Sequence, residues 1–190
     1  MSIGWNLLPA AETRVAIIGN SGSGKSTLAQ AISAESGLEI VSFDDIFWEP
    51  GGFNQAKNEA RQLEELRFST RGSSWIAEGV FGKFIEEIFD RASSLIWMDL
   101  PWKECQEGIF QRAAAHGRER EEALVEWASN YWSREGRTSF RGHERFFENF
   151  PGPSRMRLRS REQAASFIVG IRDGSYFGRS SQCSLPESTG

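Results

Sequence analysis

The chain has 190 residues, 39% of them hydrophobic, which is enough for one domain with a buried core. Its net charge of −4 argues against direct nucleic-acid binding, and no apolar run is long enough to span a membrane. Only two cysteines occur, Cys105 and Cys183, and their separation argues against a disulfide framework or a zinc site. The first residues also lack the features of a signal peptide. We therefore expect a cytoplasmic protein.

The strongest motif lies between an apolar run at 15–18, which predicts a buried strand, and a helix predicted over 25–36. The residues between them match G-x-x-x-x-G-K-[ST] at every fixed position. Backbone N–H groups of such a loop, together with the N-terminus of the helix, form a cradle for anions. Lys25 can contact the β and γ phosphates of ATP, and Ser26 can bind Mg²⁺. The predicted ATP-binding residues are Gly19, Asn20, Ser21, Gly22, Ser23, Gly24, Lys25, Ser26 and Thr27.

Three later apolar segments predict strands that end in or lead to an acidic residue. They are 38–43 with Asp44, 75–79 with Glu78, and 94–99 with Asp99. In an open parallel sheet, the carboxyl ends of the strands face the ligand crevice. Asp44 can orient Mg²⁺ waters or accept a proton from an acceptor hydroxyl, and the alternative is a turn or helix N-cap. Asp99 is typical of a Walker B carboxylate, so we predict it as a magnesium residue alongside Ser26.

The rest of the chain predicts mostly helices. A polar helix over 54–70 belongs to an insertion at about 45–72, which is either a cover for a second substrate or an ordinary amphipathic crossover. Further helices are predicted over 81–91, 102–116, 119–135, 141–150 and 161–172, and a fifth strand over 156–160. The Ser/Gly-rich residues 174–190 predict a flexible tail, which leaves residues 1–173 as one domain.

Arginines gather late in the chain. From Arg112 to Arg161 there are 11 of the 18 arginines and no lysine. The planar fork of the guanidinium suits phosphate, although a coding bias toward arginine is the alternative. We therefore predict that residues at about 112–145 form an arginine-rich helical lid, which excludes water from a moving phosphoryl group.

The chain resembles the small P-loop kinases of the adenylate kinase and shikimate kinase type. It is most similar to the bacterial group called DNA topology modulation proteins, or adenylate-kinase-like ATPases, over roughly residues 13–172. The segments that carry this likeness are GNSGSGKSTLA at 19–29, FDDIFWEPGGF at 43–53, WIAEGVFG at 75–82, ASSLIWMDLPW at 92–102 and ENFPGPSRMRLRS at 148–160. The group has Asp-Gly where this chain has Glu78-Gly79, and adenylate kinases have an arginine where this chain has Lys83.

The resemblance implies a three-layer α/β/α fold whose parallel five-stranded sheet has the order 2-3-1-4-5. It also implies binding of ATP and Mg²⁺, with Lys25 and Asp44 at the reaction centre. Arg112 and Arg118 would be the catalytic lid arginines, although they are six residues apart rather than the four of adenylate kinases. The predicted function is transfer of the γ-phosphoryl group of ATP to a small nucleotide-like or nucleoside-like acceptor. The alternative is a nucleotide-dependent regulatory ATPase without such an acceptor.

Overall fold

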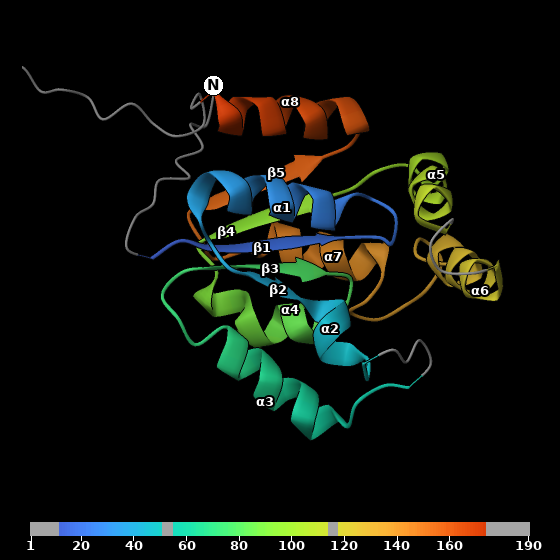
Figure 1. The fold of residues 1–190 in the computed structure, drawn as a ribbon, viewed down its shortest axis with the longest axis horizontal. Coiled ribbons are helices and arrows are strands. Elements are labelled where there is room, and N and C mark those ends of the chain that lie inside the picture. The colour runs from blue at the N-terminus through green and yellow to red at the C-terminus, as the bar shows by residue number, and fades with distance from the viewer. Residues whose placement is uncertain (1–11, 51–54, 114–117, 174–190) are drawn as a thin grey trace, which may run out of the picture.

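The computed structural model describes residues 12–50, 55–113 and 118–173. Five strands alternate with helices along these segments, as Figure 1 shows. The elements in chain order are β1 Arg14–Gly19, α1 Lys25–Ser36, β2 Ile40–Ser42, α2 Phe43–Phe47, α3 Glu59–Ser69, β3 Trp75–Gly79, α4 Gly82–Ile88, the 3₁₀ turn η1 Phe89–Arg91, β4 Ser94–Met98, α5 Trp102–Ala113, α6 Arg118–Ser129, α7 Phe140–Glu148, β5 Ser154–Leu158 and α8 Arg161–Arg172. No helix in these segments could cross a membrane.

The strands form one parallel sheet in the order β2-β3-β1-β4-β5, which confirms the predicted topology. The first strand of the chain therefore lies at the centre, between β3 and β4. Its alternate side chains are buried on both faces of the sheet: Val15 and Ile17 face one layer of helices, and Ala16 and Ile18 face the other. The loop that follows β1 consequently begins in the middle of the carboxyl edge of the sheet.

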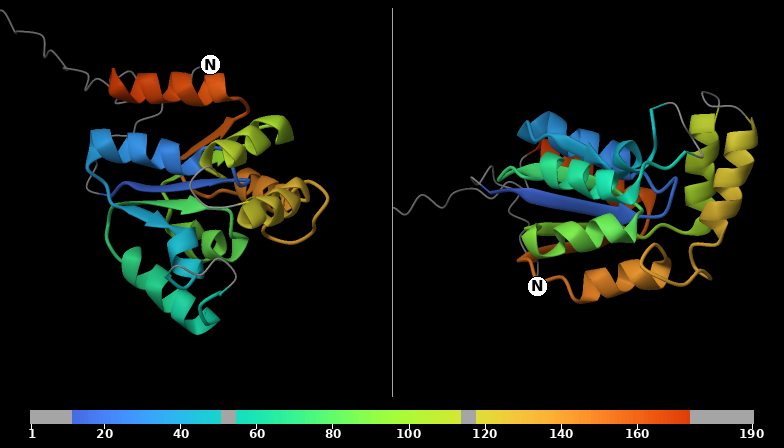
Figure 2. Two further views of the ribbon diagram at one scale, coloured as in Figure 1. Left: turned by 45° about the vertical axis from the view of Figure 1, so that its right-hand side comes forward. Right: turned by 90° about the horizontal axis from the view of Figure 1, so that it is seen from below.

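Helices cover both faces of the sheet, as the edge-on view of Figure 2 shows. On one face, α1 and α8 pack on the sheet through residues such as Leu28 and Phe167. On the other face, α4 and α7 bury Phe84, Ile88 and part of Phe147 against Trp97. The helices α5 and α6 stand beside each other beyond the carboxyl ends of the strands (Figures 1 and 2). This is the edge on which the predicted site lies.

The main difference from the sequence predictions lies after the second strand. The predicted strand over 38–43 is shorter, because the helix α2 begins at Phe43. Phe43 and Ile46 are one helical turn apart and both are buried, and the acidic Asp44 and Asp45 occupy the first turn, where the helix dipole favours negative charge. Asp44 therefore lies inside a helix and not at the end of a strand, which corrects the sequence interpretation.

Other element boundaries shifted by a few residues. The polar helix predicted over 54–70 begins at Glu59, after Asn58 caps it by accepting a hydrogen bond from the N–H of Ala60. The helix predicted to end at 135 ends at Ser129. There, the side chains of Ser129 and Asn130 donate hydrogen bonds back to the carbonyl of Glu126, which turns the chain away from the helix axis. The predicted tail at 174–190 lies outside the described residues.

Candidate active site at the phosphate loop

The predicted phosphate loop connects β1 to α1 at the carboxyl edge of the sheet. Gly24 has a φ of 93° and immediately precedes the helix, a conformation that glycine adopts most readily. No side chain of the described residues caps α1, so the first N–H groups of this helix lack the partner that most helices have. Lys25 is buried, and its Nζ donates to the carbonyl oxygen of Asn20, 2.8 Å away, across the loop.

These features fit the phosphates of ATP. Uncapped N–H groups at the start of a helix and an ammonium group inside the loop are the donors that a phosphate group accepts from. The Oγ of Ser23 is also buried in the loop without a hydrogen-bond partner among the described residues. A buried hydroxyl without a partner costs free energy, and an anion in the loop can supply the missing contact.

Asn20 links the loop to the helix α6. Its side-chain Nδ2 donates to the carbonyl of Ala128 in α6, at 2.9 Å, and its Oδ1 accepts from the N–H of Ser21 at 2.8 Å. Asn20 is 1% exposed, so both contacts are shielded from water. The backbone of the loop and the last turn of α6 are therefore held together by one side chain.

The tip of the loop is in close backbone contact with α5. A Cβ built on Gly22 would lie 2.0 Å from the carbonyl oxygen of Cys105, and one built on Gly108 would lie 2.2 Å from the carbonyl oxygen of Gly22. Both distances are far below a real contact, so neither position has room for a side chain. The helix α5 can approach the loop this closely because both residues are glycines.

We expect Gly108→Ala to push α5 away from the phosphate loop. The added methyl group would lie 2.2 Å from the backbone carbonyl oxygen of Gly22 and 2.7 Å from the Nη2 of Arg161. The arginine side chain can move aside, but the contact with the backbone cannot be relieved without a backbone shift. We expect a loss of stability of about 1–3 kcal/mol and a lower affinity for ATP. Thermal unfolding and nucleotide titration measure both effects. Gly72→Ala is the matched control, because its added methyl group would lie 3.8 Å from the nearest atom of Ser74, an ordinary contact. Equal effects of the two variants would contradict the role of the close backbone contact.

An acidic residue lies next to the hydroxyl of the loop. The Oγ of Ser26 donates to the Oε1 of Glu78 at 3.0 Å. Glu78 comes from the carboxyl end of β3, the neighbour of β1, and is 6% exposed. A hydroxyl and a carboxylate in contact, beside a phosphate cradle, are oxygen ligands of the kind that Mg²⁺ prefers. These two residues could hold Mg²⁺, which would neutralise phosphate charge.

The other two predicted acids lie elsewhere on this edge. Asp99 follows β4 and forms an ion pair with Arg157 of β5, with 2.8 Å between the Nε and Oδ2 atoms. Burial raises the pKa of Asp99, and the neighbouring arginine opposes that rise. Asp44 is exposed in the first turn of α2. Glu78 contacts Ser26 of the phosphate loop in this structure, and the magnesium role of Asp99 stays a prediction.

The predicted lid arginines lie at the ends of the two helices beyond the sheet. Arg112 lies in the last turn of α5, and Arg118 is the first residue of α6. Their side chains lie outside the described part of the structure. Their catalytic roles remain predictions.

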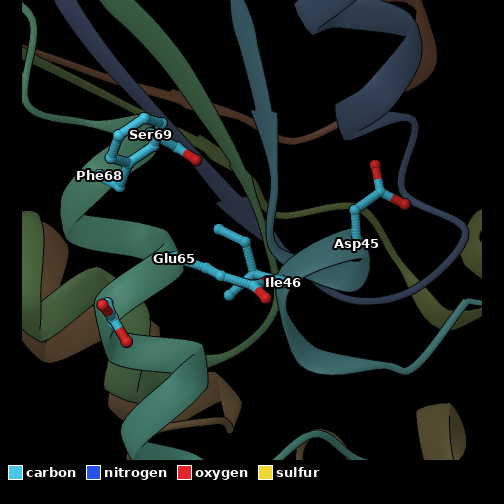
Figure 3. A pocket seen from close by; sticks show the side chains of 6 residues that line it. Asp45, Ile46, Glu65, Phe68 and Ser69 are labelled. Atoms are coloured by element: carbon cyan, nitrogen blue, oxygen red, sulfur yellow. The ribbon is translucent and has the colours of Figure 1, made fainter.

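The predicted insertion forms a hollow beside this edge. A pocket of about 480 Å³ lies between α2 and α3. Figure 3 shows Ile46 and Glu65 facing each other across it, while the carboxylate of Asp45 points away from Glu65. The remaining lining residues are Glu64, Phe68 and Ser69. Three of the six lining residues are acidic, but Glu65 is paired with Lys57 and Arg61. Asp45 and Glu64 are therefore the lining carboxylates that disfavour an anionic ligand.

A buried histidine supports the end of β3. The Nε2 of His143, on α7, lies 3.0 Å from the carbonyl oxygen of Val80, and the Nδ1 lies 2.7 Å from the hydroxyl of Tyr131. Because the carbonyl can only accept, Nε2 carries the proton, and the Tyr131 hydroxyl donates to Nδ1. Burial lowers the pKa of His143 to about 3, so the ring is neutral at pH 7. The contact to Val80 steadies the segment that follows Glu78.

The fold is similar to those of small-molecule kinases. A shikimate kinase from Acinetobacter baumannii in complex with shikimate matches with a TM-score of 0.54 at 12% identity, over 86% of this chain and 94% of that chain. A gluconokinase from Sinorhizobium meliloti 1021 matches with a TM-score of 0.50 at 14% identity, over 88% and 97%. A shikimate kinase from Bacteroides thetaiotaomicron matches with a TM-score of 0.50 at 13% identity, over 85% and 96%.

No family model and no curated protein matches this chain. At identities below 15%, the structural likeness shows the fold alone: the chain has the three-layer fold of the P-loop kinases. The resemblance to the topology modulation group stays an interpretation of the sequence.

The sequence predicted a loop between β1 and α1, which the structure has, but two parts of its surroundings were not predicted. The pairing of Ser26 with Glu78 depends on β3 lying next to β1, which the sequence does not encode locally. The buried pair of Tyr131 and His143 joins the end of α6 to α7. The only signal for this pair in the sequence was a histidine inside an amphipathic helical pattern. Such a histidine more often packs in the core than takes part in a functional site.

Proposed function

We propose that this protein is an ATP-dependent kinase that transfers the γ-phosphoryl group to a small acceptor. The observation that supports this proposal most is a complete phosphate loop in a kinase fold, with Ser26 of the loop bonded to a buried carboxylate from the neighbouring strand. The loop N–H groups and Lys25 would hold the β and γ phosphates. The roles of Arg112 and Arg118 are to neutralise transferring charge from the lid.

The acceptor would lie on the side of α2 and the insertion. Asp44, on the exposed first turn of α2, would orient the acceptor or take the proton of its hydroxyl. Asp45 and Glu64 in the neighbouring pocket make a neutral or cationic acceptor a better match than a phosphorylated one. Nucleoside-like acceptors belong to the neutral class, and we propose them ahead of nucleotides.

A panel assay tests the kinase proposal directly. The protein is mixed with ATP, Mg²⁺ and one candidate acceptor at a time, and ADP release is measured. We expect one neutral hydroxyl compound to raise ADP release well above the rate in water alone. A slow release that no acceptor changes would favour the regulatory ATPase instead, and no release together with no ATP binding would contradict both functions.

We expect Glu78→Gln to weaken the affinity of the protein for Mg²⁺. The amide can still accept the hydrogen bond from Ser26 but loses the negative charge that favours a divalent cation. The Mg²⁺ concentration for half-maximal ATP turnover should rise about 10-fold or more, and kcat should fall about 100-fold. The matched control is Glu86→Gln, since Glu86 forms a surface ion pair with Arg137.

Comparison with Asp99→Asn decides between the two predicted magnesium carboxylates. If Asp99 acts mainly through its ion pair with Arg157, this change lowers stability and leaves the Mg²⁺ requirement near that of the natural protein. If Asp99→Asn raises the Mg²⁺ requirement and Glu78→Gln does not, Asp99 and not Glu78 is the magnesium residue.

A further inference from the structure

A ring of hydrogen bonds joins the phosphate loop, α6, α7 and the end of β3. From the loop, Asn20 donates to the carbonyl of Ala128 in the last turn of α6, and the backbone N–H of Tyr131 donates to the same carbonyl at 3.2 Å. The hydroxyl of Tyr131 contacts His143 of α7, which in turn contacts the carbonyl of Val80. The phosphate loop is therefore connected, through two helices, to the segment that follows β3.

The ring closes at Glu78, which lies shortly before Val80 in the chain. The carboxylate of Glu78 accepts from the hydroxyl of Ser26, which belongs to the phosphate loop. The members of the ring other than Ser26 are buried, namely Asn20, Ala128, Tyr131, His143, Val80 and Glu78. Because water does not compete for buried hydrogen bonds, these contacts are stronger than they would be on the surface.

Side chains hold the segment after Glu78 in place. The pairing of β3 with β1 extends to Gly79, so Val80 lies beyond the paired residues. His143 donates to the carbonyl of Val80 at 3.0 Å, and the Oγ1 of Thr138 accepts from the N–H of Gly82 at 2.9 Å. These two contacts come from α7 and from the connection between α6 and α7, which spans residues 130–139.

The 130–139 connection has little freedom to move against this segment. A Cβ built on Gly82, at the start of α4, would lie 2.3 Å from the carbonyl oxygen of Arg137. One built on Gly142 of α7 would lie 2.4 Å from the same oxygen. Contacts between backbones packed this closely transmit a displacement, because they leave no space in which it could be absorbed. The position of α7 therefore affects the segment after β3.

Tyr131 determines how His143 faces Val80. Burial raises the pKa of the Tyr131 hydroxyl, so this group keeps its proton and donates it to Nδ1 of the ring. The hydrogen bond at one nitrogen of a histidine sets which nitrogen carries the proton. The ring consequently presents its Nε2–H to the carbonyl of Val80.

We propose that His143, oriented by Tyr131, is a positioning residue for Glu78 as a magnesium ligand. This inference rests on the proposed kinase function, in which Ser26 and Glu78 hold Mg²⁺. His143 acts through Val80: it fixes the backbone that follows Glu78 and thereby the direction of the carboxylate toward Ser26. Loss of a group that orients a metal ligand typically lowers metal affinity by about 10- to 100-fold.

Two replacements of His143 test the proposal, because each keeps one of its two hydrogen bonds. The amide of asparagine lies as far from Cβ as Nδ1 does, so His143→Asn keeps the acceptor for Tyr131 and loses the donor to Val80. The longer amide of glutamine reaches the place of Nε2, so His143→Gln keeps the donor and loses the acceptor.

ATP binding is measured by calorimetry at a series of Mg²⁺ concentrations. We expect the Mg²⁺ concentration for half-maximal binding to rise about 10-fold in His143→Asn and less than about threefold in His143→Gln. Each variant gives up one buried hydrogen bond, so a purely structural role would change both proteins equally. Equal Mg²⁺ requirements in the two folded variants would therefore overturn the proposal.

Thr70→Val is the matched control outside the ring. The buried hydroxyl of Thr70 donates to the carbonyl of Leu66 in α3, so its loss should lower stability and leave the Mg²⁺ requirement unchanged. Thr138→Val provides a second test if His143→Asn does not fold, since valine keeps the shape of the side chain and removes the acceptor for Gly82. We expect it to raise the Mg²⁺ requirement about threefold, and an unchanged requirement would contradict the proposal.

Glu78→Gln separates this inference from the proposed function. If Glu78→Gln raises the Mg²⁺ requirement and His143→Asn does not, only the positioning role of His143 is wrong. If Glu78→Gln leaves the requirement unchanged, the magnesium role of Glu78 is wrong, and the positioning role with it. If the natural protein binds no ATP at any Mg²⁺ concentration, the proposed function itself fails.

Discussion

Lys25→Met is expected to weaken binding of ATP·Mg²⁺ at least about 100-fold and to reduce ADP release to the background rate. The ammonium group of Lys25 is buried inside the phosphate loop, where it donates to the carbonyl oxygen of Asn20. A charge in a shielded position interacts strongly with phosphate, because little water screens it. Methionine keeps the length and apolar stem of the side chain, so the loop should keep its packing.

Two measurements separate loss of the charge from loss of the fold. Thermal unfolding of Lys25→Met should stay close to that of the natural protein, since methionine keeps most of the apolar stem of the side chain. Lys103→Met is the matched control, because Lys103 is exposed on α5 and its replacement should leave ATP binding unchanged. A folded Lys25→Met protein that binds ATP with natural affinity would contradict the assignment of the loop.

The free energy of unfolding is expected to fall by about 2 kcal/mol between pH 7 and pH 5 because of His143 alone. Complete burial holds the pKa of this histidine at about 3, against a usual value of 6.5, and the charges of Lys25 and Arg134 act in the same direction. Between pH 6.5 and pH 3, the histidine is therefore protonated in the unfolded chain but neutral in the folded protein. This stabilisation is complete above pH 6.5 and is lost as the pH falls from 6.5 toward 3.

Urea unfolding at pH 5, 6 and 7 measures this slope, which is the change in the free energy of unfolding with pH. His143→Gln removes the titrating group, so the loss of stability between pH 7 and pH 5 should shrink by most of that amount. The variant should also be about 1–3 kcal/mol less stable at pH 7, because the buried hydroxyl of Tyr131 loses its acceptor. His116→Gln, which removes the only other histidine of the sequence, is the control and should retain the slope. An unchanged slope in His143→Gln would show that the buried ring is not its source.

The main elements of the fold could be predicted because their signals are local. The apolar run before Gly19 and the helix after Lys25 lie where they were predicted, since a strand, a glycine-rich turn and a helix start each need particular residues in sequence order. The helix over Arg161–Arg172 was predicted with its true ends, because Ser160 caps it by accepting from the N–H of Gln163. The strand order followed from a resemblance to a family and not from periodicity.

The sequence was less informative where two kinds of structure use the same residues. An apolar run before two acids indicated a strand ending at Asp44, but Phe43 and Ile46 are also spaced for one face of a helix. Burial of both side chains beside α3 and α4 favours the helix, and that burial is a property of the folded protein. A local pattern cannot distinguish the two possibilities.

The amino-acid sequence by itself determined the phosphate loop, with Lys25 and Ser26 at its end, because backbone turns, helix start and charge are all set within a few neighbouring residues. Only the tertiary structure decided which groups surround that loop. Parallel pairing of β3 with β1 brings Glu78 to Ser26, and packing of α6 brings Ala128 to Asn20. Such contacts join residues more than fifty positions apart, and their geometry depends on the whole sheet and not on any one segment.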